Sequence, residues 1–230
     1  MGAGAEHDAR WLAYCRDPGL LAVYEIDDDI IHLDPDNAIP YSIFTPNRSG
    51  TAQNLFDADH VIVSTPNLAR KLVDYCRPPD IGDRITVAPN CVERVMPARE
   101  FDIGKAVGPV TVGWAGSMFH QQDFPPAMLE QLREVAARRP DVRWVSIGAD
   151  YIRQAVPSAQ FFGWGSIAQY HSRLPFIDIG IAPIQRTPFN ASKSWIKALD
   201  YMAHGVVPVV ENWGRSEEHT SELQSPIHIS

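Results

Sequence analysis

The sequence predicts an α/β protein built on mostly parallel sheets. Short apolar runs typical of buried strands alternate with amphipathic helical segments. About 45% of the 230 residues are hydrophobic, which is ample for buried cores. Residues 91–108 show no clear period and separate two alternating regions. We therefore expect a domain over residues 1–90, a linker over 91–108 and a second domain over 109–214.

The first region predicts three strands and one helix. The apolar runs at residues 20–26, 60–64 and 84–88 are bounded by turn residues, which is typical of short buried strands. After the second run, Thr65 can cap a helix and Pro66 fits its first turn. This pattern predicts a helix that continues to about Cys76.

The second region predicts five strands and three helices in alternation. The strands are expected at residues 110–115, 142–148, 159–163, 176–183 and 206–210. The helices are expected at residues 125–139, 166–174 and 192–204, with Asp123 as a cap of the first. Because parallel sheets bind ligands beyond the carboxyl ends of their strands, candidate sites are sought in the loops there.

Charge and hydropathy exclude several classes of partner. The formal net charge of -8 gives no general attraction for nucleic acid, so no nucleic-acid partner is expected. No apolar run approaches the roughly 18 residues of a membrane span. The N-terminus also lacks the basic and apolar regions of a signal peptide, and a cytoplasmic location is expected.

The first candidate site is the loop after the strand at residues 110–115. It contains Gly116, Ser117, His120 and Asp123. A glycine directly after a strand lets a ligand approach the backbone, and a hydroxyl with amides at a helix start can bind an anion. The alternative is a tight turn in which Ser117 and Asp123 serve only as caps. No H-E-x-x-H motif or G-x-S-x-G elbow is present, so a hydrolase triad is not expected. His120 is the histidine we expect to take part in chemistry, since His60 and His171 lie in ordinary strand or helix patterns.

The second candidate site is one face of the helix predicted at residues 192–204. Lys193, Lys197, Asp200 and His204 share this face, and an apolar face is formed by Trp195, Ala198, Leu199 and Met202. In the first helical turn the macrodipole disfavours a cation, so Lys193 there indicates a bound anion. Asp200 can accept a hydrogen bond from a sugar hydroxyl. A solvated face with a weak Lys197–Asp200 pair is the alternative.

The third candidate site is the acidic cluster Asp27, Asp28 and Asp29, which follows the strand at residues 20–26. Clustered carboxylates can bind a hard cation, act as a base or orient sugar hydroxyls. They can equally form a solvated acidic turn. No companion metal ligands are identifiable, so a metal ion is not expected.

Six segments in order resemble bacterial glycosyltransferases of the GT-B architecture, similar to family 4 and its relatives in surface-polysaccharide synthesis. The segments are residues 24–30, 58–72, 85–92, 112–124, 178–184 and 189–210. The resemblance implies two facing Rossmann-like domains, an acceptor-side one at the N-terminus and a nucleotide-sugar-binding one at the C-terminus. It also implies a transferase that moves a sugar from a nucleoside diphosphate donor to a hydroxyl of a glycan or lipid-linked saccharide.

The resemblance assigns roles to residues of this chain. The resemblance places donor binding on Gly116, Ser117, Lys193, Ser194, Lys197 and Asp200, and we expect His120 and Asn190 to belong to the same donor-binding set. Asp27, Asp28 and Asp29 would lie on the acceptor side, and Asp28 and His120 are the catalytic candidates. The amides, Ser117 and the lysines would stabilise the diphosphate without a cofactor or a metal. Ser192 and Asp200 stand where family 4 enzymes commonly have two glutamates, which leaves retention or inversion open.

Two other functions stay open: a nucleotide-sugar epimerase of the same architecture, and a non-catalytic nucleotide-sugar-binding module. Both ends of the chain are also unusual. Residues 215–225 resemble the translation of a short-read sequencing adapter, so residues 215–230 are expected to be non-native. Because few residues precede the first predicted strand, we expect both domains to be incomplete and the fragment itself to be inactive. A peripheral membrane contact is expected through the missing parts.

Overall fold

The structure is a computed structural model that describes residues 10, 13–14, 19–76, 81–92 and 108–211. The predicted tail at 215–230 and most of the predicted linker lie outside these residues. The chain forms two compact units. Within the described residues, the first unit combines the chain up to Asn90 with the segment Arg186–Ser194. The second combines the chain from Cys91 to Gln185 with the chain from Trp195 onward.

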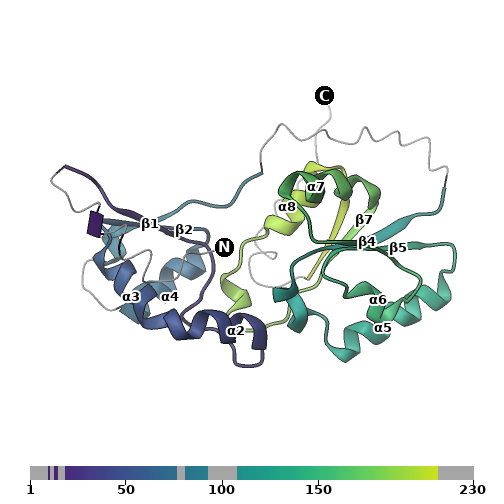
Figure 1. Ribbon diagram of the computed structural model, residues 1–230, viewed down its shortest axis with the longest axis horizontal. Coiled ribbons are helices and arrows are strands. Elements are labelled where there is room, and N and C mark those ends of the chain that lie inside the picture. The colour runs from purple at the N-terminus through teal and green to yellow at the C-terminus, as the bar shows by residue number, and fades with distance from the viewer. Residues whose placement is uncertain (1–9, 11–12, 15–18, 77–80, 93–107, 212–230) are drawn as a thin grey trace. The chain divides into compact units, whose positions relative to one another are not determined.

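The first unit contains a three-stranded parallel sheet in the order β1-β2-β3. The strands are β1 (Val23–Ile26), β2 (His60–Val63) and β3 (Ile85–Val87). The helices α2 (Ala38–Phe44) and α3 (Arg48–Asp57) connect β1 to β2, and α4 (Pro66–Cys76) connects β2 to β3, as Figure 1 shows. Three short 3-10 helices complete the unit: η1 (Thr45–Asn47), η2 (Ile81–Arg84) and η5 (Asn190–Ser192).

The core of the first unit is a cluster of buried aliphatic side chains between the sheet and its helices. Its members come from β1, β2, α3, α4 and the adjoining loops: Ala22, Ile26, Ile31, Leu55, Ala58, Val61, Val63, Leu68 and Leu72. Leu68 and Leu72, four residues apart on α4, are both fully buried. Burial of this one face explains why α4 forms where the sequence predicts it. The amide of Leu68 also donates to Thr65 Oγ1 at 3.1 Å, which confirms the predicted cap.

The second unit contains a five-stranded parallel sheet in the order β6-β5-β4-β7-β8. The strands are β4 (Thr111–Gly116), β5 (Arg143–Gly148), β6 (Gln160–Gly163), β7 (Ile179–Ala182) and β8 (Val207–Val210). The chain thus adds β5 and β6 on one side of β4 and then β7 and β8 on its other side. This reversal creates a topological switch point between β4 and β7, where open parallel sheets bind ligands.

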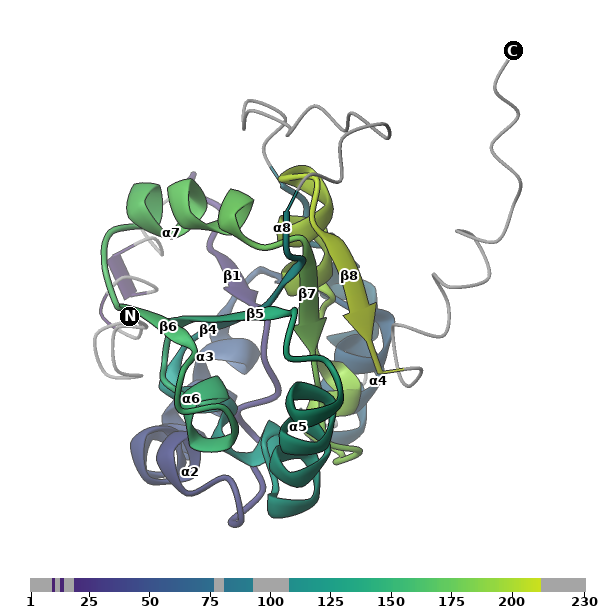
Figure 2. The same ribbon diagram turned by 90° about the vertical axis from the view of Figure 1, so that its right-hand side faces the viewer.

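Helices cover both faces of this sheet, as Figure 2 shows. One face carries α5 (Pro126–Arg138) and α6 (Ile152–Ala155), and the other carries α7 (Ile167–Arg173) and α8 (Ile196–Ala203). Two 3-10 helices, η3 (Met118–Asp123) and η4 (Leu174–Phe176), follow β4 and α7. Each face has its own core, centred on Trp114 beside α5 and on Tyr201 beside α7.

The second unit confirms the predicted alternation of strands and helices with shifts of a few residues at the ends. One difference matters for the site. The last helix was expected from residue 192, but α8 begins at Ile196, and residues 190–192 form η5 in the first unit. The buried face of α8 also differs, because Ala198, Tyr201 and His204 are buried whereas Leu199 and Met202 are only half-buried.

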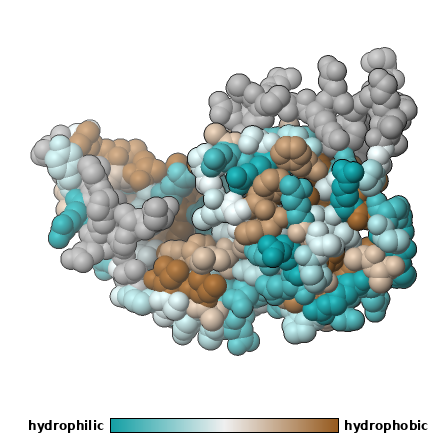
Figure 3. Space-filling model, turned by 45° about the vertical axis from the view of Figure 1, so that its right-hand side comes forward, coloured by the Kyte–Doolittle hydropathy of each residue, from teal (hydrophilic) through white to brown (hydrophobic). Residues whose placement is uncertain are grey.

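The surface seen in Figure 3 mixes hydrophilic side chains with separate hydrophobic ones. The exposed large hydrophobic residues include Trp164 and Ile167 in the second unit and Leu21 in the first. Across the described ranges, no helix has the length and apolar character needed to cross a membrane.

Candidate functional site

At the carboxyl end of β4, Lys197 of α8 lies against the consecutive residues Trp114, Ala115 and Gly116. Lys197 Nζ, from α8, donates to the carbonyl oxygen of Ala115 at 2.7 Å and lies 5.2 Å from the centre of the Trp114 ring. A Cβ atom on Gly116 would lie 2.7 Å from both Lys197 Nζ and a Trp114 ring atom. Gly116 is therefore required for the close approach of the lysine. Two members of the predicted donor set, Gly116 and Lys197, thus lie side by side.

The hydroxyl of Tyr201 bridges β4 and β7 at the switch point. The ladder between β4 and β7 pairs Val112 with Ile179 and Gly113 with Gly180. Beyond the last of these pairs, the buried Tyr201 hydroxyl accepts from the backbone amide of Ala115 at 3.0 Å and donates to the carbonyl of Ile181 at 3.2 Å. The side chain thus takes the place of direct pairing where the strands separate. Burial raises the pKa of this hydroxyl, which keeps it protonated at physiological pH.

Ser117 and His120 occupy the loop that follows β4. Ser117 is the N-cap of η3, and its hydroxyl accepts from the amide of Phe119 at 3.4 Å. His120 Nδ1 lies 2.9 Å from Asp123 Oδ2, and its ring packs edge-on against Trp114 at 6.0 Å. Asp123 was expected to cap the next helix. It does not, because α5 has Pro125 at its N-cap and the Asp123 carboxylate binds His120 and the amide of Gln185.

Asp200 lies on α8, one turn after Lys197. Its carboxylate accepts a hydrogen bond from the Tyr170 hydroxyl at 3.2 Å. Burial raises the pKa of Asp200, while the Tyr170 bond and the charges of His171, Lys197 and His204 lower it. Burial also raises the pKa of Tyr170, together with the nearby negative charge of Asp200. Asp200 is a half-buried acceptor held by a hydroxyl donor.

His204 departs from its predicted place on an open face of the helix. It is buried, its Nδ1 lies 2.7 Å from the carbonyl oxygen of Asp200, and its ring stacks on His171 with centres 5.2 Å apart. The residue therefore closes the end of α8 and packs against α7. It is a core residue and not a ligand of the predicted strip.

Lys193 also departs from its predicted position. It lies after η5 in extended backbone, three residues before α8, and not in the first turn of a helix. Its Nζ donates to Asp28 Oδ1 at 2.9 Å and lies 4.6 Å from the centre of the Phe189 ring. The argument from the helix macrodipole is therefore wrong for Lys193. The cation is balanced by a carboxylate of the acidic cluster.

The segment Arg186–Ser194 is attached to the first unit by polar contacts. Side chains that follow β2 donate to its backbone: Thr65 to the carbonyl of Ser192 at 2.9 Å and Asn67 to that of Ala191 at 2.8 Å. After β3, the side-chain amide of Asn90 donates from Nδ2 to the Ser194 hydroxyl at 2.8 Å. These contacts place the segment at the carboxyl ends of β2 and β3. Asn190, also in the segment, is buried.

The acidic cluster is not a solvated turn. Asp29 is fully buried, and its carboxylate binds Lys71 Nζ at 2.8 Å and His32 Nδ1 at 2.8 Å. The Lys71 ammonium also donates to the carbonyl of Pro188, which ties the buried pair to the segment Arg186–Ser194. Desolvation and the negative charge of Asp28 raise the pKa of the exposed Asp27, while the charge of Lys193 lowers it.

The predicted donor set thus divides between the two units. The second unit carries Gly116, Ser117, His120, Lys197 and Asp200. The first unit carries Asn190, Lys193 and Ser194 together with the acidic cluster. In the part of the chain that the structure describes, no group of three or more His, Cys, Asp or Glu side chains could hold a metal ion.

Sequence reasoning missed Tyr170, Tyr201 and Gln185. The two tyrosines contact the site through their hydroxyls, and nothing in their spacing distinguishes them from ordinary core aromatics. Their partners lie 20 to 86 residues away in the sequence. Gln185 contributes a backbone amide, which no sequence pattern can identify.

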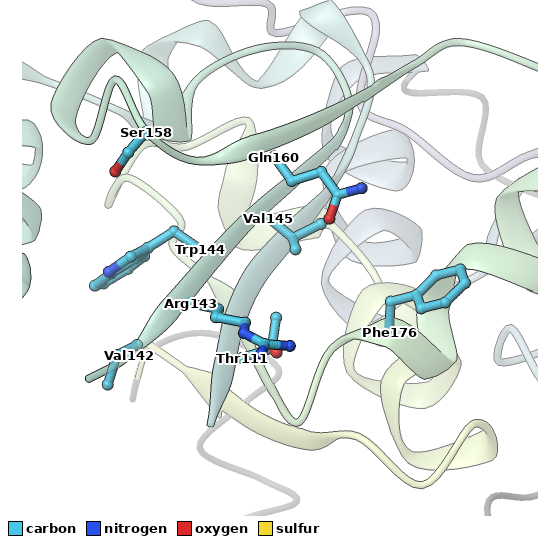
Figure 4. A pocket seen from close by; sticks show the side chains of 8 residues that line it. All are labelled: Thr111, Val142, Arg143, Trp144, Val145, Ser158, Gln160 and Phe176. Atoms are coloured by element: carbon cyan, nitrogen blue, oxygen red, sulfur yellow. The ribbon is translucent and has the colours of Figure 1, made fainter. Parts of the chain in front are cut away.

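A pocket of about 420 Å³ lies elsewhere in the second unit (Figure 4). Thr111, Arg143 and Gln160 line it from the first residues of β4, β5 and β6, and Phe176 adds an aromatic wall. It therefore opens at the amino ends of the strands. Ligands of open parallel sheets bind at the opposite edge, so this pocket is separate from the candidate donor site.

Comparison with known proteins supports the fold. No protein-family model and no curated protein matches the sequence. The chain is similar to Staphylococcus aureus TarM, in the crystal structure of a mutant with Fondaparinux, alpha-GlcNAc-glycerol and UDP. The TM-score is 0.59 at 14% identity, over 88% of this chain and 39% of TarM. A second TarM structure gives a TM-score of 0.57 at 12% identity, over the same shares of the two chains.

The pneumococcal O-GlcNAc transferase GtfA, solved with UDP and GlcNAc, gives a TM-score of 0.50 at 13% identity. The match covers 75% of this chain and 34% of GtfA. The chain therefore spans well under half the length of these proteins. At such identities the similarity establishes the fold alone. It is an α/β fold with parallel Rossmann-like sheets, as in glycosyltransferases of the GT-B type.

Proposed function

We propose that the chain is part of a glycosyltransferase and that its second unit binds the nucleoside diphosphate of a sugar donor. The observation that carries the proposal is the position of Lys197, whose ammonium lies against Gly116 at the carboxyl end of β4. This is the switch point of the sheet, where a ligand is expected. A cation fixed beside a residue without a side chain favours an anion that approaches the backbone closely.

A diphosphate fits the surrounding groups better than a smaller anion. Ser117 at the start of η3 and His120 three residues later add polar groups beside the lysine. Asp200, one turn beyond Lys197, supplies a carboxylate suited to a sugar or ribose hydroxyl. The order of cation first and carboxylate second matches a ligand with phosphates at one end and hydroxyls at the other.

The reaction that these groups support is transfer of the sugar to an acceptor hydroxyl. The bond between the anomeric carbon and the diphosphate oxygen breaks, a bond to the acceptor oxygen forms, and the acceptor loses its proton. Lys197 would neutralise the charge that develops on the leaving diphosphate. Asp28 is the candidate to receive the proton, and His120 is a candidate to donate a hydrogen bond to the leaving diphosphate. The complexes of TarM with UDP and of GtfA with UDP and GlcNAc support a nucleotide sugar as donor and a glycan as acceptor.

Binding measurements on the chain test this function. Isothermal titration calorimetry with UDP, GDP and ADP is expected to detect binding of at least one nucleoside diphosphate. Lys197→Met should weaken that binding about 10- to 100-fold, since a hydrogen bond to a charged group contributes roughly 1.5–3 kcal/mol. Arg138→Met is the matched control. Arg138 is an exposed cation at the C-terminal end of α5, and the chain continues from there to the amino end of β5, away from the candidate donor site.

Two results would contradict the proposal: no affinity for any of the three nucleotides, or equal affinities for Lys197→Met and the wild type. Thermal unfolding of each variant separates lost binding from lost folding. Product analysis then identifies the reaction. Conversion of the donor sugar without an acceptor would indicate epimerisation, and binding without any turnover in a longer form of the protein would indicate a binding module.

A further inference from the structure

Asp123 joins the two loops that border the switch point. It is the last residue of η3 after β4, and only 3% of its surface is exposed. One carboxylate oxygen lies 2.9 Å from His120 Nδ1, and the other accepts from the backbone amide of Gln185 at 2.9 Å. Gln185 follows β7, the strand beside β4 at the switch point. The carboxylate is therefore fixed on both sides.

A buried carboxylate bound to one imidazole nitrogen determines the chemistry of the other. When Nδ1 donates its proton to Asp123, the neutral ring has its acceptor at Nε2. The same carboxylate stabilises the imidazolium that forms when Nε2 takes up a proton. His120 is thus held in one tautomer and one orientation, with its charged form supported from behind.

Two further titratable groups contact the ring and the loop that His120 contacts or belongs to. Lys197 from α8 lies over the Trp114 ring that His120 contacts edge-on. The Tyr151 hydroxyl, next to α6, donates to the carbonyl of Met118 at 2.6 Å. The positive charge of Lys197 opposes protonation of His120. A dianionic ligand beside both groups reverses that balance and favours the imidazolium.

We propose that Asp123 is a positioning residue that makes His120 take up a proton when the donor diphosphate binds. The inference rests on the proposed function, because it requires a diphosphate at the end of β4. The proton passes from the acid form of the buffer to Nε2: the buffer's bond to that proton breaks and an N–H bond forms. Asp123 contacts His120 rather than the ligand.

Proton uptake is measurable by titrating the protein with UDP in two buffers that differ in ionisation enthalpy. At about pH 7.5, above the usual histidine pKa of about 6.5, the wild type is expected to take up a fraction of a proton per UDP bound. Asp123→Asn keeps an oxygen to accept from Gln185 but removes the charge behind His120. This variant should take up no proton and bind UDP about tenfold more weakly.

Control variants separate positioning from a merely structural role. His120→Gln should lose the same proton uptake, and the double variant should lose no more than either single one. Asp141→Asn, an equal change of charge at an exposed aspartate paired with Arg139, should behave as the wild type. Circular dichroism of each variant reports whether the fold is retained.

The outcomes distinguish this inference from the proposed function. If UDP binds the wild type without proton uptake, or if folded Asp123→Asn keeps the uptake, the inference is overturned and the donor site stands. If neither UDP nor another nucleoside diphosphate binds, the proposed function fails and the inference fails with it. Unequal uptake by Asp141→Asn and the wild type would attribute the effect to net charge and also overturn the inference.

Discussion

Gly148, the last residue of β5, offers the sharpest test of how the end of the sheet is built. Its φ is 90°, a region in which residues with a side chain are strained. A Cβ atom there would overlap the carbonyl oxygen of Gly116, the residue paired with it on β4. In Gly148→Ala the backbone strain costs about 1–2 kcal/mol. The steric overlap costs about 1–3 kcal/mol more, so a loss of roughly 2–5 kcal/mol is expected.

Gly163 is the matched control, since it ends β6 and pairs directly with Gly148. A Cβ atom on Gly163 would meet no atom closer than 3.9 Å, and the residue is not among those with positive φ. Gly163→Ala is therefore expected to be neutral or slightly stabilising. The two variants make the same chemical change at neighbouring strand ends. Only the space and the backbone conformation differ.

Urea unfolding followed by tryptophan fluorescence measures both variants. Trp114 and Trp144 are buried in this unit and report its unfolding. The reasoning would be refuted if Gly148→Ala unfolded within about 0.5 kcal/mol of the wild type, the usual range of a surface substitution. Equal losses in both variants would refute it as well. UDP titration gives a second measurement, because displacing Gly116 should also weaken nucleotide binding.

Three further predictions concern single side chains. Burial raises the pKa of Asp200 in the folded state above the ordinary value of 3.8, so the stability that this group contributes at low pH is lost as the pH rises through the folded-state pKa. Asp200→Asn should therefore increase the free energy of unfolding near pH 7 in urea and give no gain below pH 3.8. The same variant should bind UDP more weakly. Tyr201→Phe leaves the amide of Ala115 without its hydroxyl acceptor and should cost about 1–3 kcal/mol in the same assay, whereas an unchanged value would contradict the bridging role. Because Lys193 pairs with Asp28, calorimetry should show a smaller loss of UDP affinity for Lys193→Met than for Lys197→Met, and the reverse order would restore the original assignment of Lys193.

The strands and long helices could be predicted from the sequence because their patterns are local. The residues of β2 and α4 fall where the apolar run and the Thr65-Pro66 start signal indicate. The helices α2 and α3 were not predicted. The hydrophobic pattern of α3 is weak, and its buried positions include the polar residues Thr51 and Asn54. Contacts with the rest of the unit, and not a local pattern, stabilise that helix.

The error at Lys193 has a clear physical origin. A helical period fits residues 192–204 as a whole, and no proline or glycine marks a break before α8. The helix begins later than predicted because residues 192 and 193 make contacts with residues far away in the sequence. The Ser192 carbonyl receives a bond from Thr65, 127 residues earlier, and Lys193 reaches Asp28, 165 residues earlier. Such contacts leave no trace in a local pattern.

The corrected position of Lys193 changes which cation the donor hypothesis depends on. Two lysines on one helix would have shared the charge of a diphosphate. With Lys193 balanced by Asp28 in the first unit, that role in the second unit passes to Lys197, supported by the His120–Asp123 pair. The contacts of Lys197 with Ala115, of His120 with Asp123 and of Asp123 with Gln185 lie within the second unit. Nucleotide affinity should therefore respond to substitutions around the end of β4 and be nearly insensitive to Asp28→Asn. A large loss of UDP affinity in Asp28→Asn would contradict this prediction and show that the acidic cluster takes part in donor binding.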